Sequence, residues 1–248
     1  MDGPILLCTA TTTEARACHS GIKRSGTSDY FEVLKTGMGL IRASQALKSR
    51  LLDASRPAPV LIISTGFAGS LVSEIPCQSW VIGRTLHAWN HSGEEQVISL
   101  SDASFGQKLS TYEVAWIPAK IFSAQKFLTT KTVTPQGIQV VDLESFSLAQ
   151  VAKTFNISFQ ILRLISDTPS KPIPKAILTF SEMSLSSSEL EWTKKLKCTT
   201  QGLKEVFHQP IKLSRFLLYG MRLPFQLETG WSIASKALVQ PQLLRNHL

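Results

Sequence analysis

The stretch Val140-Val141-Asp142-Leu143-Glu144-Ser145, followed downstream by Ile165-Ser166-Asp167, decides the predicted fold. Between the two, apolar residues recur at the spacing of the buried face of an amphipathic helix: Leu148, Val151, Ala152 and Phe155. Asn156 can end that helix in a left-handed conformation. Residues 158–165 (SFQILRLI) then form a mostly apolar segment, typical of a strand buried on both faces of a parallel sheet.

This order of elements predicts an α/β protein with carboxylates at strand ends. In open α/β sheets, ligands bind outside the carboxyl ends of the strands. We therefore expect Glu144 and Asp167 to lie at neighbouring strand ends and to face one ligand crevice.

The same residues carry a resemblance to a known family. VVDLES, then SLAQVAKTFNISFQILRLISD, resembles the C-terminal half of the methylthioadenosine/S-adenosylhomocysteine nucleosidases, in the nucleoside phosphorylase superfamily. That pattern has a Met-Glu pair, here Leu143-Glu144, and a strand ending Arg-x-x-Ser-Asp, here from Arg163 to Ser166-Asp167. The chain departs from it at Leu143 and at Ser158, where the family has Met and Pro.

Earlier segments agree with this family in order and spacing. Thr11-Thr12-Thr13-Glu14 resembles an acidic first loop whose last Glu is catalytic, and Thr36-Gly37-Met38-Gly39 resembles a Thr-Gly-Ile-Gly turn. Thr65-Gly66-Phe67-Ala68-Gly69 resembles an Asn-Thr-Gly-x-Ala-Gly turn. Phe127-Leu128 resembles a Phe-Ile pair that holds adenine. The matches run from about residue 5 to 169.

The resemblance implies a single domain over residues 1–248, with a three-layer α/β/α architecture and a mixed, mostly parallel central sheet. The segment 171–248 is atypical of the family in its length, and residues 227–244 are expected to supply the last helix. The resemblance also implies a homodimer.

It further implies a division of labour among three carboxyl groups. Asp167 would protonate adenine N7, Glu144 would grip the ribose hydroxyls, and Glu14 would position and deprotonate water. Cleavage of an N-ribosidic bond needs these three actions, and carboxyl groups can supply them when their environments set their pKa values apart. The expected substrate-binding residues are Ser166, Arg163, Leu143, Phe127, Leu128, Phe67, Ala68 and Gly69.

Each of these residues also has a structural interpretation. Thr11-x-x-Glu14 fits a helix capping box, Glu144 could favour the positive end of the following helix, and Ser166-Asp167 could form a turn. Asp142 is interpreted as capping or structural. Arg163, which stands alone in an apolar strand, is expected to pair with a carboxylate.

The predicted function is hydrolysis of 5′-modified adenine nucleosides without metal or organic cofactor. Candidate substrates are methylthioadenosine, S-adenosylhomocysteine, 5′-deoxyadenosine and aminodeoxyfutalosine, which would place the chain in methionine salvage or menaquinone biosynthesis. The alternatives are a phosphorolytic purine nucleoside phosphorylase and a non-catalytic nucleoside-binding protein of the same fold. Glu14 in the first loop would repel phosphate and so favours water as the nucleophile.

Composition excludes several other classes. The 248 residues are 43% hydrophobic, which suffices for a large core, and they contain no apolar run long enough to span a membrane. The net charge of +8 is concentrated in residues 171–248 but lacks interleaved aromatic residues, so nucleic acid is not expected as a partner. The four cysteines have no metal-ligand spacing and predict reduced thiols in a cytoplasmic protein. His87 and His91 are assigned to a hairpin rather than to a metal site.

Overall fold

A computed structural model describes residues 3–100, 105, 109, 115–126, 134–173 and 222–243, with side chains described up to residue 239. Phe127 and Leu128, predicted to hold adenine, lie outside these residues, as does Cys198. Among the described residues no helix is long and apolar enough to cross a membrane.

Eight strands form one mixed sheet in the order β2-β1-β3-β7-β6-β4-β5, with β8 paired to β3 and β4. Their bounds are β1 Ile5–Thr9, β2 Phe31–Lys35, β3 Leu61–Ser70, β4 Trp80–Trp89, β5 Glu95–Ser99, β6 Trp116–Ser123, β7 Val140–Asp142 and β8 Ser158–Asp167. The β3–β7, β4–β5 and β4–β8 pairs are antiparallel and the others are parallel. The predicted mixed, mostly parallel sheet is confirmed.

Part of this sheet closes on itself. The pairs β3–β7, β7–β6, β6–β4, β4–β8 and β8–β3 form a ring. The sheet is therefore not open at this point, and the strands that precede Glu144 and carry Asp167 are not neighbours, contrary to the expectation. β7 and β8 run antiparallel on opposite edges of β3, and both pair with Gly69, through Val141 and Asp167 respectively.

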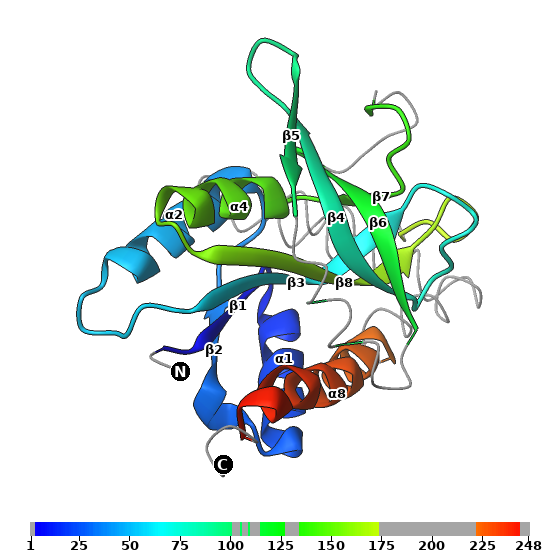
Figure 1. The fold of residues 1–248 in the computed structure, drawn as a ribbon. Helices are drawn as coiled ribbons and strands as arrows, with labels where there is room; N and C mark the ends of the chain where they lie inside the picture. The colour runs from blue at the N-terminus through cyan, green and yellow to red at the C-terminus, as the bar shows by residue number, and fades with distance from the viewer. Residues whose placement is uncertain are drawn as a thin grey trace, which may run out of the picture.

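Helices cover both sides of the sheet (Figure 1). They are α1 Thr12–Ser25, α2 Leu40–Leu52, α4 Ser145–Thr154 and α8 Leu223–Leu243, with a short 3-10 turn at Ser28–Tyr30. α1 and α8 share one apolar cluster with β1, β3, β4 and β8, whereas α2 and α4 share another with β1 and β3. The predicted three-layer α/β/α architecture is confirmed.

The helix and strand predicted after Glu144 are confirmed. Leu148, Val151 and Ala152 are buried in α4, and Asn156 has a φ of 56°, the left-handed conformation expected after the helix. β8 follows from Ser158, and its residues from Gln160 to Ser166 are buried. The polar side chains after β7 and β8 are thereby carried into the interior.

The last helix, α8, reaches the middle of the sheet. Gly21 of α1 allows a close approach, because a Cβ there would lie 2.3 Å from the carbonyl oxygen of Glu228. Trp231 is fully buried, and its Nε1 donates a hydrogen bond to Thr65 Oγ1 at 3.0 Å. The predicted final helix is confirmed, and it supports the strand segment that carries the candidate site.

Candidate active site

Glu14 forms the predicted capping box and a further contact with β3. Its Oε2 accepts hydrogen bonds from the amide and the hydroxyl of Thr11 at 2.7 and 2.8 Å, and Thr11 Oγ1 accepts from the Glu14 amide at 3.2 Å. Its Oε1 accepts from the Phe67 amide at 2.8 Å. Glu14 is 3% exposed. A cap alone would not require the carboxylate to reach across to β3, so the capping reading is true but incomplete.

Gly66 makes room for that contact. Its φ is 134°, which side-chain-bearing residues rarely adopt. A Cβ there would lie 2.2 Å from Glu14 Oε1 and 3.2 Å from Arg163 Nη1. Glu14 and Arg163 therefore flank one point of the β3 backbone. The predicted turn at residues 65–69 is in fact part of continuous strand β3, with this glycine as its irregular point.

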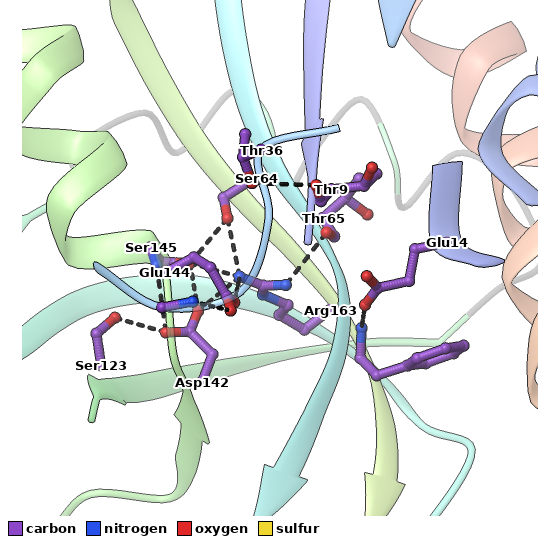
Figure 2. Close-up of polar contacts among 12 residues, drawn as sticks. Thr9, Glu14, Thr36, Ser64, Thr65, Ser123, Asp142, Glu144, Ser145 and Arg163 are labelled. Atoms are coloured by element: carbon purple, nitrogen blue, oxygen red, sulfur yellow. Dashed lines mark hydrogen bonds and ion pairs between the residues drawn. The ribbon is translucent and has the colours of Figure 1, made fainter. Parts of the chain in front are cut away.

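Arg163 is buried at the centre of a polar network (Figure 2). Its Nη1 donates to the carbonyl oxygen of Thr65 at 3.1 Å. Its Nη2 lies 2.8 Å from Asp142 Oδ2 and 2.9 Å from the hydroxyl oxygens of Ser64 and Ser145. The expectation that Arg163 pairs with a carboxylate is confirmed, and its principal partner is Asp142.

Asp142, which was interpreted from the sequence as capping or structural, connects the parts of this network. Its side chain is fully shielded from solvent. Oδ1 accepts from the Ser123 hydroxyl at 2.5 Å and from the Ser145 amide at 3.3 Å, and Oδ2 accepts from the Ser145 hydroxyl as well as from Arg163. The network thus joins β6, β7, β8 and the first residue of α4.

Glu144, the N-cap residue of α4, lies beside this network and is 5% exposed. Its Oε1 accepts from the Gly39 amide at 3.1 Å, and its Oε2 lies 3.6 Å from Arg163 Nη2. The pKa of Glu144 is raised to about 8, mainly by burial and to a lesser extent by Asp142 and Glu14, while Arg163 and the Gly39 amide oppose the shift. Arg163 therefore lies between two carboxylates, with Glu144 at 3.6 Å and Glu14 across Gly66.

Asp167 ends β8 and pairs in register with Gly69. The Ser166 hydroxyl donates to Asp167 Oδ1 at 2.6 Å and lies 3.2 Å from the carbonyl oxygen of Ala68. Burial raises the pKa of the Asp167 carboxyl, and the Ser166 hydroxyl opposes the shift. A raised pKa is the direction of shift that a general acid requires.

Gly69 has a different role from the one assigned to it as a turn residue. It lies in β3 and its φ is not positive, but a Cβ there would lie 2.9 Å from Asp167 Oδ2 and 3.2 Å from Val141. The missing side chain therefore leaves space for the Asp167 carboxyl group. Gly37 and Gly39 do have positive φ, at 83° and 91°.

The structure places the remaining predicted residues as follows. Ala68 is buried in β3, Phe67 is half-buried and packs against the cluster of α1 and α8, and Leu143 is buried beside Phe122 and Ala124. Among the described residues, no group of three or more His, Cys, Asp or Glu side chains could hold a metal ion. His87 and His91 belong to the β4–β5 hairpin, and His87 Nδ1 lies 2.6 Å from Glu95 Oε1.

A groove of about 880 Å³ lies along α2 and α4. Met38 and Gly39, which precede α2, line it together with Phe146 and Gln150 of α4. Residues of the β4–β5 hairpin, Asn90 among them, line its other side. Because the Gly39 amide binds Glu144, one end of the groove adjoins the buried carboxylate.

Comparison with solved structures identifies the same architecture in three nucleosidases. A futalosine hydrolase mutant from Helicobacter pylori strain 26695 is 18% identical, with a TM-score of 0.60 over 80% of this chain and 99% of that one. A Helicobacter pylori 5′-methylthioadenosine/S-adenosylhomocysteine nucleosidase is 18% identical (TM-score 0.59, 82% and 97% covered). A Neisseria meningitidis nucleosidase of the same name is 12% identical (TM-score 0.60, 96% and 99% covered).

No family model and no curated protein matches the chain. At these identities the structural similarity establishes the fold. The chain therefore has the fold of the methylthioadenosine/S-adenosylhomocysteine and futalosine nucleosidases, the family that its motifs resemble.

Proposed function

We propose that this chain hydrolyses the N-ribosidic bond of 5′-modified adenine nucleosides and releases adenine. The observation that carries the proposal is the environment of Asp167. It is a carboxyl group with a raised pKa, held by Ser166 and given space by Gly69. A general acid that protonates a departing base needs this combination of a raised pKa and a fixed direction.

The other two carboxyl groups support hydrolysis rather than phosphorolysis. Glu14 is buried against β3 at the place where the resemblance puts the nucleophile, and a carboxylate there favours water over phosphate. Arg163, the arginine at the centre of the site, is committed to Asp142 and to serine and threonine oxygens. Glu144 would bind the ribose hydroxyls.

The groove beside Glu144 supports a substrate with a bulky 5′ substituent. In the proposed arrangement the ribose lies at Glu144, and its 5′ end points into the groove past Met38 and Gly39. Aminodeoxyfutalosine is the leading candidate, which would place the reaction in menaquinone biosynthesis. Methylthioadenosine, S-adenosylhomocysteine and 5′-deoxyadenosine are the other candidates.

We also propose that the chain forms a homodimer. Ile41, on α2, lines the groove and is 72% exposed. Val97, on β5, lines the adjoining surface and is 53% exposed. Large exposed apolar side chains grouped along one surface favour an interface. Light scattering at micromolar concentration is expected to give twice the mass of 27.3 kDa, and a monomer mass would exclude the dimer.

One observation favours the non-catalytic alternative, a nucleoside-binding protein. Glu14 already accepts three hydrogen bonds from the chain itself, so it could serve the fold alone. Adenine release from the four candidate nucleosides, with and without phosphate, separates the possibilities. Release in phosphate-free buffer supports the hydrolase, and an absolute phosphate requirement supports a phosphorylase. Binding without release from any of them supports the binding protein.

A further inference from the structure

Arg163 Nη2 has more acceptors around it than hydrogens to give. Three oxygens lie within 2.9 Å, namely Asp142 Oδ2 and the hydroxyl oxygens of Ser64 and Ser145. Nη2 carries two hydrogens. Glu144 Oε2, at 3.6 Å, lies beyond hydrogen-bond distance and is the acceptor that goes without.

Asp142 is the strongest of these acceptors for Arg163 Nη2, and it has no acceptor position left for a ligand. It is a full negative charge at 2.8 Å, and charge-assisted hydrogen bonds are roughly twice as strong as neutral ones. Ser123 and Ser145 occupy its remaining acceptor positions, and its side chain is fully shielded from solvent. It therefore acts through Arg163 and Glu144 rather than by contact with a ligand.

We propose that Asp142 is a positioning residue that holds the Arg163 guanidinium and so leaves Glu144 Oε2 able to accept from a ligand hydroxyl. That Glu144 accepts from a ligand rests on the proposed function, which places ribose at Glu144. The part that concerns the three side chains rests on their geometry alone.

The proposal predicts what happens when Asp142 loses its charge. In Asp142→Asn the guanidinium of Arg163 keeps Glu144 as its remaining ion-pair partner, and Nη2 turns a hydrogen toward Glu144 Oε2. Glu144, which is only a 3.6 Å ion-pair partner of Arg163 in the wild type, then accepts a direct hydrogen bond from Arg163 rather than from a ligand. The charged groups that act on Glu144 are Arg163 of β8, Asp142 of β7 and Glu14 of α1, so this change alters its dominant neighbours.

The test follows the Glu144 carboxyl carbon by NMR in protein labelled with ¹³C at glutamate Cδ, with Glu144→Gln to identify the signal. The wild-type signal is expected to titrate with a midpoint of about 8. Asp142→Asn is expected to lower that midpoint by about one unit or more, because the Glu144 carboxylate gains a hydrogen bond from the Arg163 cation and loses an adjacent anion. Ser123→Ala is the matched control, since it removes a hydrogen bond to Asp142 Oδ1 without changing any charge.

A second variant keeps the proposal testable if Asp142→Asn does not fold. Ser64→Ala/Ser145→Ala removes two of the three close acceptors of Nη2, frees one hydrogen for Glu144 and retains Asp142. It is expected to lower the midpoint in the same direction, whereas Ser145→Ala alone leaves two acceptors for two hydrogens and is expected to leave it unchanged.

An unchanged Glu144 midpoint in the folded Asp142→Asn variant, or in the double serine variant when the former does not fold, overturns the proposal. A shift as large in Ser123→Ala as in Asp142→Asn also overturns it, because general loosening of the network would then explain the result. These titrations need no substrate. Failure to release adenine would refute the proposed function and leave the titration result standing.

Discussion

Glu14 Oε1 accepts a hydrogen bond from the Phe67 amide at 2.8 Å, so the first turn of α1 is fixed to the middle of β3. The carboxylate is therefore both a helix cap and part of the candidate site. Its position does not depend on side-chain packing alone, because both oxygens are engaged by the chain.

Glu14→Gln is expected to lower kcat for adenine release by roughly 10²-fold or more, because the amide retains an oxygen acceptor but cannot accept a proton from water. Thr11→Ala, which removes the cap hydroxyl, is expected to cost about 1 kcal/mol of unfolding free energy and little of kcat. Denaturant unfolding and steady-state kinetics measure the two effects. Near-parental kcat in Glu14→Gln would restrict Glu14 to capping.

Gly66→Ala is expected to destabilise the fold by more than about 3 kcal/mol, since the new Cβ combines a positive φ with a clash 2.2 Å from Glu14 Oε1. Gly26→Ala is the control. Gly26 also has a positive φ, 73°, but a Cβ there meets nothing within 4 Å, so a cost of about 1 kcal/mol is expected. Equal losses of unfolding free energy in the two variants would contradict the assigned role of the Glu14 contact.

Asp167→Asn keeps the shape of the side chain and removes the acidic proton. It is expected to lower kcat by roughly 10²-fold or more while adenine still binds weakly. Asp29→Asn, on the exposed turn after α1, serves as the control and is expected to retain parental kcat. If the two variants have similar kcat on the best substrate, the general acid has been assigned to the wrong residue.

Stability should depend on pH through Glu144. Its pKa is about 8 in the folded chain against an ordinary value of 4.5, so the folded state binds the proton more tightly than the unfolded chain. The free energy of unfolding should consequently fall as pH rises from about 4.5 to about 8. Glu144→Gln should reduce that fall without abolishing it, because Asp167 also has a raised pKa. If unfolding free energy falls equally with pH in the wild type and in Glu144→Gln, Glu144 is not a source of the pH dependence.

The groove beside Glu144 predicts that substrates with 5′ substituents of different sizes are accepted. Aminodeoxyfutalosine is expected to be cleaved with a kcat/KM at least equal to that of methylthioadenosine, a comparison that reports transition-state discrimination between substrates. A preference of more than about tenfold for methylthioadenosine, or some 1.4 kcal/mol, would indicate a small closed pocket instead.

The sequence predicted α4 and β8 because their apolar patterns are strong and local. It did not predict the ring of strands, since strand pairing across β3 depends on contacts between residues far apart in the chain. A last helix was predicted over residues 227–244 and is found at Leu223–Leu243, but its support of Thr65 through Trp231 was not predicted.

The sequence suggested which residues form the candidate site, but not which hydrogen bonds and ion pairs join them. Arg163 pairs with a carboxylate as expected, but that carboxylate is Asp142, which was interpreted as capping or structural. One signal could have revealed this network. Ser64, Ser123 and Arg163 each interrupt or end an apolar strand, and buried polar residues require partners.

The central claim, hydrolysis by water, is tested most directly by incubating the chain with aminodeoxyfutalosine or methylthioadenosine in phosphate-free H₂¹⁸O. We predict release of adenine and incorporation of one ¹⁸O atom at C1′ of the freed sugar, detected by mass spectrometry after brief reaction. Asp167→Asn should slow the appearance of both products together. Release that requires phosphate and yields a sugar 1-phosphate without ¹⁸O, or binding of the nucleosides without any release, would contradict the account.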